Sequence, residues 1–176
     1  GKHYPLQITD KVTTEAPHFV ELAHHQPSTL TSEQFKEIYS ITENALNALG
    51  ITNGASHSEY KITKDGRIAI MEIGGRMGGD FIGSDLVQLS TDYDFVKGVI
   101  EVALGLFEEP KITAHKFSGV YFLCKETENL LPIISNWQDN PAFVMGEITS
   151  TELRNVEKSA DRSGYAIYQS DKKLEI

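Results

Sequence analysis

The spacing of apolar residues predicts one long helix in the first third of the chain. Apolar positions recur every three or four residues between residues 35 and 49, and Gly50 follows the last of them. Thr31 and Gln34 have the spacing of a capping box, and glycine is common just past a helix end. We therefore expect a helix that begins after Thr31 and ends before Gly50.

Other segments have the short or alternating apolar pattern of strands, and two more have helical spacing. The pattern predicts strands at residues 6–9, 19–22, 55–62, 67–73, 119–124, 143–148 and 165–168. It predicts helices near residues 84–85, at 92–104 and at 130–137. This mixture indicates an α+β protein, and residues 110–116 form a candidate seam between two parts.

An Asp-Gly pair separates two of the predicted strands, which is a strong hairpin signal because both residues tolerate positive φ. If Asp65-Gly66 is a two-residue turn, Lys64 pairs with Arg67 and Glu59 lies directly opposite Glu72. A three-residue loop is the alternative. It would shift the pairing by one residue and place the two acids on opposite faces.

The predicted register places two carboxylates side by side on one face, together with His57, Lys61 and Ile70. At a separation of about 5 Å and an effective dielectric of about 20, two carboxylates repel by roughly 3 kcal/mol. Such a pair indicates a cation between the acids or a shared proton, and magnesium favours hard oxygen ligands of this kind. The alternative is a solvated face on which Lys61 neutralises part of the charge.

A segment with four glycines, residues 74–80, follows the second predicted strand of the hairpin; we call it the glycine-rich loop. It contains Arg76, so a cation and backbone N–H donors for phosphate lie at the same end of the hairpin as Glu72. The spacing matches neither the phosphate loop of nucleoside triphosphatases nor the dinucleotide fingerprint. The acids and the loop together predict adjacent magnesium and phosphate ligands.

Composition and charge narrow the expected partners. The 176 residues are 40% hydrophobic and carry 25 acidic against 16 basic side chains, for a net charge of -9. This excess repels a nucleic-acid backbone, so we expect no nucleic-acid partner, whereas a single nucleotide needs only local donors. The lone Cys124 cannot form an internal disulfide, and no apolar run is long enough for a bilayer. We expect a cytoplasmic protein without a membrane segment.

Residues 57–61, 65–66 and 70–80 resemble the metal-binding end of the ATP-grasp superfamily, in particular its ligases similar to biotin carboxylase, carbamoyl-phosphate synthase and L-amino-acid ligases. That pattern has a glutamate on one strand, a turn, and a second strand ending in glutamate, any residue, asparagine, any residue, arginine. Glu59, Glu72 and Arg76 match the two acids and the arginine. Gly74 stands where the family usually has asparagine. Residues 8–11, 19–22 and 159–165 resemble further parts of the family.

The resemblance implies the C-terminal half of the ATP-grasp fold, an antiparallel sheet flanked by helices, at residues 1–110. A smaller, sheet-rich, carboxylase-like lobe would follow at residues 111–176. The implied activity is that of an ATP-dependent ligase that activates a carboxylate as an acyl phosphate and joins it to an amine. ATP and Mg²⁺ are the implied cofactors, with Mn²⁺ as a possible substitute. We expect ATP-binding domains upstream in the same parent chain, a chain that is inactive by itself, and a homodimer as one possible assembly.

The resemblance also assigns roles to residues. Glu59 and Glu72 would bind the metal, Gly74 and Gly75 would help bind the nucleotide, and Arg76 would stabilise charge on the transferred phosphoryl group. Two alternatives use the same scaffold. One is a metal-dependent hydrolase with His57 as a further ligand, and the other is a non-catalytic interaction or regulatory module, which the glycine at position 74 favours.

Several other polar residues are candidates with open alternatives. His57 and His25 could contact substrate, and Glu21 and His24 could line the same pocket. For the histidine pair, an exposed connection before Pro27 is the alternative. Lys11 could contact phosphate or form a solvated strand end. We expect Asp161 and Arg162 to form an ion pair that fixes a turn.

Overall fold

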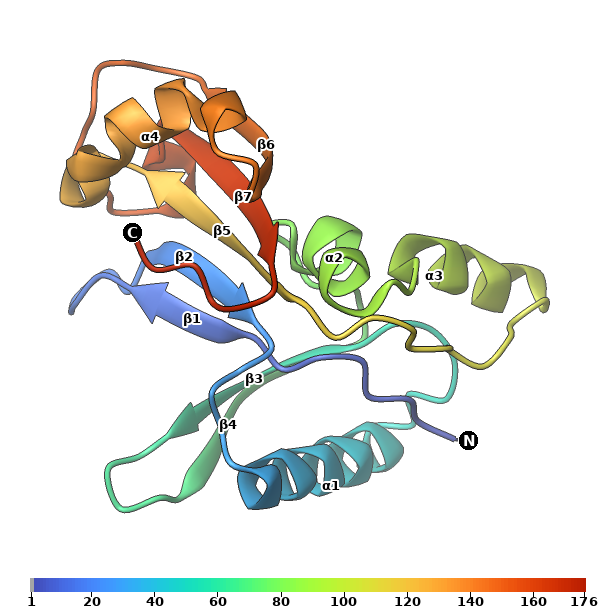
Figure 1. Ribbon diagram of the computed structural model, residues 1–176. Helices are drawn as coiled ribbons and strands as arrows, with labels where there is room; N and C mark the ends of the chain where they lie inside the picture. Colours follow the sequence, from blue (N-terminus) through green and yellow to red (C-terminus); the bar gives the residue numbers. More distant parts are fainter. Residues whose placement is uncertain (1) are drawn as a thin grey trace.

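The computed structural model describes residues 2–176 as a mixture of helices and antiparallel strands, and the predicted α+β class is confirmed at that level. A five-stranded antiparallel sheet has the order β1-β2-β5-β7-β6, and a separate hairpin pairs β3 with β4 (Figure 1). The strands are β1 (Asp10–Thr13), β2 (Glu21–Gln26), β3 (His57–Ile62), β4 (Ile68–Gly74), β5 (Phe117–Leu123), β6 (Phe143–Ile148) and β7 (Gly164–Ser170).

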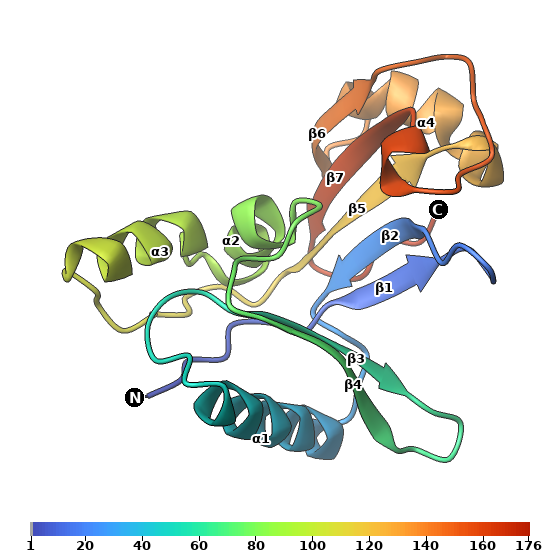
Figure 2. The same ribbon diagram turned by 180° about the vertical axis from the view of Figure 1, so that it is seen from behind.

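Some helices cover the two faces of the larger sheet and one side of the hairpin, and the bounds of all the helices in the described residues follow. They are α1 (Ser32–Ala48), η1 (Ile82–Leu86), α2 (Val87–Thr91), α3 (Phe95–Leu104), η2 (Lys125–Leu130), α4 (Leu131–Ser135), η3 (Trp137–Asp139) and η4 (Ser159–Asp161). Seen from behind, α3 extends sideways, away from both sheets (Figure 2). Of the helices in residues 2–176, none is long and apolar enough to cross a membrane.

Helix α1 forms as its sequence predicts. The Thr31 side chain accepts from the Gln34 backbone N–H, and the Gln34 side chain accepts from the Thr31 N–H, so the predicted capping box is confirmed. The helix lies along the β3–β4 hairpin (Figure 1), and the hydroxyl groups of Thr42 and Tyr60 are 2.7 Å apart. This packing gives the hairpin one covered face and leaves the other for the site.

Alternation along β5 and β7 produces two separate cores. Val120 and Phe122 face η1 and α2, whereas Leu123 and Tyr168 face α4 on the opposite side. These side chains are almost fully inaccessible to solvent. Because successive strand residues point to opposite faces, the neighbouring residues His24 and His25 of β2 contact different faces, His24 near Phe122 and His25 near Tyr168.

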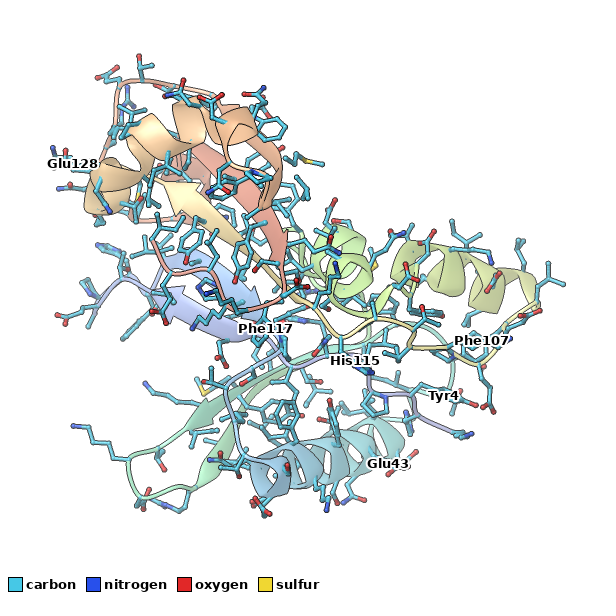
Figure 3. The ribbon with its side chains drawn as sticks, in the orientation of Figure 1. Tyr4, Glu43, Phe107, His115, Phe117 and Glu128 are labelled. Atoms are coloured by element: carbon cyan, nitrogen blue, oxygen red, sulfur yellow. The ribbon has the colours of Figure 1, made fainter. Side chains whose placement is uncertain are left out.

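The first two strands lie later in the chain than predicted. Strand β1 begins at Asp10, after the predicted segment 6–9, and β2 extends to Gln26 instead of ending near residue 22. Strand β2 also pairs with β5, so the five-stranded sheet includes residues from both sides of position 110. The division into parts 1–110 and 111–176 stays a prediction. Near the chain start, the rings of Tyr4 and Phe107 are 5.6 Å apart (Figure 3).

The hairpin has the predicted pairing at its functional end but a different turn. Thr63 and Arg67 close a three-residue loop, with the Thr63 N–H donating to the Arg67 carbonyl at 2.9 Å. The register then shifts once, so that Met71 is the extra residue of a β-bulge. That bulge restores the pairing of Glu59 with Glu72, and the expected opposition of the two acids is confirmed.

Two details of the predicted register are therefore wrong. Lys64 lies inside the loop rather than opposite Arg67, and Lys61 pairs with Ala69 rather than with Ile70. Gly66 adopts a φ of 83°, which suits the last position of a three-residue loop. The loop is one residue longer than predicted, which shifts the pairing by one residue. The one-residue bulge shifts it back, so Glu59 still pairs with Glu72.

Candidate active site

The two hairpin acids are each paired with a cation of the same chain. Lys11 Nζ lies 2.5 Å from Glu59 Oε1, and Arg76 Nη2 lies 3.1 Å from Glu72 Oε1. The Glu59 side chain is one third exposed and that of Glu72 is half exposed. The repulsion expected between the acids is thus offset by two positive charges, one from β1 and one from the glycine-rich loop.

Lys11 and His57 surround Glu59 and change its ionisation. Lys11 Nζ is also 3.6 Å from Glu21, and His57 Nε2 is 3.4 Å from Glu59 Oε1. Burial raises the pKa of Glu59, but the hydrogen bond and charge of Lys11 outweigh it and lower that pKa on balance. Burial and then the charge of Lys11 lower the pKa of His57. Glu59 is therefore an anion beside a neutral imidazole at neutral pH.

A cleft of about 380 Å³ opens beside these groups, between the hairpin end and the larger sheet. Its walls include Lys11, Glu21, His24, His57, Arg76 and Asp80. Glu59 and Glu72 are not part of the wall. They lie behind it, in contact with its lysine, histidine and arginine. Carboxylates, two cations and two imidazoles surround one cavity, which is the arrangement expected for an anionic ligand with a metal ion.

Asp80, at the end of the glycine-rich loop, binds a residue far along the chain. Arg162 donates to both of its carboxylate oxygens at 2.9 Å, and His24 Nε2 lies 3.6 Å away. The ring of His24 and the guanidinium of Arg162 hold the pKa of Asp80 well below its usual range, against the effect of burial. Arg162 is the firmer partner because its two bonds are short and parallel.

The predicted ion pair of Asp161 with Arg162 is therefore wrong. Asp161 instead accepts from the backbone N–H groups of Glu157 and Lys158, at 3.1 and 3.0 Å. Those bonds close the turn at η4 and leave Arg162 free to reach Asp80. The adjacency of Asp161 and Arg162 in the sequence suggested that the two pair with each other. In the structure, the Asp161 carboxylate instead binds backbone N–H groups of its own turn.

The two neighbouring histidines of β2 have different environments. His24 lines the cleft beside Phe122, whereas His25 lies on the other face, with its Nδ1 atom 2.9 Å from the Tyr168 hydroxyl. Both are buried, so the alternative of an exposed connection is wrong. Burial, and then the charge of Lys173, lower the pKa of His25 to about 4. The structure does not bring His25 to the cleft.

Glycines of the loop fit close contacts that a side chain would disturb. A Cβ at Gly74 would lie 3.0 Å from the His57 carbonyl oxygen and 3.2 Å from Glu72 Oε1. A Cβ at Gly75 would lie 3.4 Å from the Ile51 side chain, in ordinary contact. The position where the family usually has asparagine is therefore crowded here by its own cross-strand neighbour.

The donors present fit a magnesium ion. Among residues 2–176, no group of three or more histidine, cysteine, aspartate or glutamate side chains could hold a metal by itself. Magnesium in nucleotide sites needs only one or two carboxylates, with phosphate oxygens and water completing its shell. Glu59 and Glu72 supply that number of hard oxygen ligands from directly opposed positions.

Most candidate residues from the sequence meet at this site. The structure brings together Glu59, Glu72, Arg76, His57 and Lys11, and it leaves out His25. Asp80 and Arg162 were not expected to take part in a site. Asp80 ends the glycine-rich loop, which was a usable signal, but Arg162 is 82 positions away and no local pattern indicates it.

Comparison with known proteins shows which family part of the chain is similar to. Residues 1–85 match the ATP-grasp domain family, and the resemblance predicted from the sequence is confirmed. Residues 1–85, just under half of the 176, are thus similar to an ATP-grasp domain.

Particular relatives are ligases. Alanine–anticapsin ligase of Bacillus subtilis (strain 168) is 32% identical over 100 residues, which cover 52% of this chain and 21% of that protein. The homologue from Bacillus amyloliquefaciens is 30% identical over 116 residues, covering 57% of this chain and 24% of that protein. The chain thus spans about a fifth to a quarter of the curated relatives that it matches.

Solved structures share the fold over almost the whole chain. An L-amino acid ligase from Bacillus licheniformis superposes with a TM-score of 0.75 at 20% identity, covering 95% of this chain and 45% of the other. Phosphoribosylglycinamide synthetase from Anaerococcus prevotii gives a TM-score of 0.73 at 16% identity, covering 94% and 44%. The superpositions show a common fold, and at these identities they show the fold alone.

Proposed function

We propose that this chain forms the magnesium- and phosphate-binding part of an ATP-dependent ligase that converts a carboxylate to an acyl phosphate and joins it to an amine. The observation that carries the proposal is the direct opposition of Glu59 and Glu72, together with Arg76, which pairs with Glu72 and lines the cleft. The match to the ATP-grasp domain family and the likeness to amino-acid ligases support the same reaction class.

Each residue has a defined task in this proposal. Glu59 and Glu72 would hold Mg²⁺, which when bound neutralises charge on the triphosphate. Arg76, with a side chain more than half exposed, would exchange its contact with Glu72 for a phosphoryl oxygen. Lys11 lies beside Glu59 and would pair with phosphate when metal displaces it from that acid. His57, held neutral, would orient Glu59 or contact the substrate.

Metal and nucleotide binding test the proposal without requiring turnover. Mn²⁺ in place of Mg²⁺ can be titrated by electron paramagnetic resonance, with and without ADP. We expect Glu59→Gln and Glu72→Gln each to weaken Mn²⁺–ADP binding at least tenfold. Glu43→Gln, an exposed acid on α1, is the matched control and should bind as the wild type does (Figure 3). Equal affinity in all four proteins would exclude the hairpin as the metal site.

Activity assays then separate the proposed ligase from the two alternatives. Metal-dependent hydrolysis of an ester or amide by the chain alone, without ATP, would favour the hydrolase. A lack of any Mn²⁺–ADP binding by the full-length protein would favour the non-catalytic module. ATP turnover in the presence of amino acids is expected only with the complete set of ATP-binding residues. The same assay on the chain alone tests the prediction that it is inactive by itself.

A further inference from the structure

We propose that Arg162 is a positioning residue of the cleft: by clamping Asp80 through a two-pronged hydrogen bond, it fixes the glycine-rich loop that carries Arg76 and orients His24. The contact joins the last residue of that loop to the segment before β7. The importance of the loop for phosphate binding rests on the proposed function, whereas the clamp itself does not.

Each of the three guanidinium nitrogens of Arg162 donates a hydrogen bond inside the protein. Two of its nitrogens donate to Asp80 at 2.9 Å, and the third donates to the Ser159 carbonyl at 2.8 Å. Its plane lies 3.8 Å from the centre of the Phe122 ring, and its side chain is only 9% exposed. This burial and these internal bonds distinguish a positioning role from the exposed side chain of Arg76.

The backbone at the clamped position is strained. Asp80 and Phe81 have φ values of 49° and 66°, in the left-handed region that residues other than glycine seldom adopt. Such conformations persist only where surrounding contacts determine them, and they occur often at functional sites. Here Arg162 holds Asp80 while the Phe81 ring packs against Tyr165, with centroids 4.4 Å apart. Loss of the clamp should let the loop relax.

The segment that supplies Arg162 supports the cleft at a second point. The Ser159 hydroxyl donates to Glu21 Oε2 at 3.3 Å, so η4 contacts one wall residue while Arg162 contacts another. His24 contacts the second of these wall residues. Its Nε2 atom faces Asp80, and its Nδ1 atom is buried with no hydrogen-bond partner among the described residues. A carboxylate facing Nε2 favours the tautomer that carries its proton there.

Three substitutions and a control separate the clamp from general stabilisation. Arg162→Met keeps an apolar stem over Phe122 but removes the guanidinium, and Arg162→Lys keeps the charge without the planar fork. Asp80→Asn is nearly isosteric and serves as a second test of the same contact. Arg154→Met is the control, because the Arg154 side chain is 71% exposed and pairs only with Glu152, at 3.4 Å.

Two measurements on the ligand-free protein decide the question. Amide hydrogen exchange is recorded for residues 75–86, in which the N–H groups of Ile82, Asp85 and Leu86 donate to the carbonyls of Gly79 and Phe81, and for the buried strands β5 and β7. The imidazole nitrogen shifts of His24 report its tautomer. We expect exchange in residues 75–86 to rise at least tenfold more than in β5 and β7 in all three clamp variants. The His24 signals should move in Asp80→Asn and stay unchanged in Arg154→Met.

Two results would overturn the proposal. One is a uniform rise in exchange that matches the loss of global stability in urea, since it would make Arg162 a general stabilising residue. The other is wild-type protection of residues 75–86 in Arg162→Lys, since it would show that charge alone suffices. Neither measurement involves metal or nucleotide. The clamp and the proposed ligase function can therefore fail independently.

Discussion

Removal of the Lys11 ammonium should lower stability and strengthen metal binding at the same time. Lys11→Met deletes the charge 2.5 Å from Glu59 Oε1 and keeps the apolar stem. The two side chains are 25% and 33% exposed, so the pair lies between a buried contact and a surface ion pair. Hydrogen bonds to charged groups contribute about 1.5–3 kcal/mol and surface pairs at most about 1 kcal/mol. We expect the free energy of unfolding to fall by about 1 to 2 kcal/mol.

The gain in metal affinity has the same cause. A divalent cation at Glu59 must displace the ammonium in the wild type but not in Lys11→Met, so Mn²⁺ should bind several times more tightly in the absence of ADP. If Lys11 also pairs with phosphate, the gain should shrink or reverse when ADP is added.

Urea unfolding and Mn²⁺ titration measure the two effects. Lys36→Met, an exposed lysine on α1, is the control and should change neither. An unchanged unfolding midpoint together with unchanged Mn²⁺ affinity in Lys11→Met would refute the role given to this ion pair.

Three further predictions concern pH, Gly74 of the loop and Gly83 of η1. Because the pKa of His25 is about 4 in the folded protein against 6.5 normally, stability should be full above pH 6.5 and decline by up to about 3 kcal/mol as the pH falls through 4. A His25→Phe variant should show a flatter urea-unfolding profile over that range. Gly74→Asn should cost about 1 to 2 kcal/mol because its Cβ meets the His57 carbonyl, yet bind Mn²⁺–ADP more tightly than Gly74→Ala, which adds no ligand. Gly83→Ala places a Cβ 2.2 Å from Met77 Cγ and should destabilise by about 1 to 3 kcal/mol in urea, with partial recovery when Met77→Ala is added. The His25 prediction is contradicted if stability is equal at pH 7 and 4.5. The Gly74 prediction is contradicted if Gly74→Asn and Gly74→Ala bind Mn²⁺–ADP equally, and the Gly83 prediction if adding Met77→Ala restores no stability.

Local sequence determined the elements whose stabilising contacts lie within a few residues. The capping box at Thr31 placed the start of α1, and Gly105, with a φ of 71°, ends α3 where predicted. The Asp-Gly pair placed the hairpin, and the match of Glu59, Glu72 and Arg76 to a family pattern indicated its chemistry. In each case the interaction that fixes the structure spans one turn of helix or one β-turn.

Tertiary contacts decided the hairpin loop length, the faces of the two β2 histidines and the long-range contact of Arg162 with Asp80. Alternation alone could not show that the Asp65 turn has three residues and that a bulge at Met71 compensates for it, because both depend on how the whole hairpin packs. Nor could it assign His24 to the cleft and His25 to the opposite core, since this depends on which strand pairs with β2. Sequence alone supplied the acids and the arginine; only the folded chain brought Arg162 across 82 positions to Asp80, because contacts of that range leave no periodic or local signal.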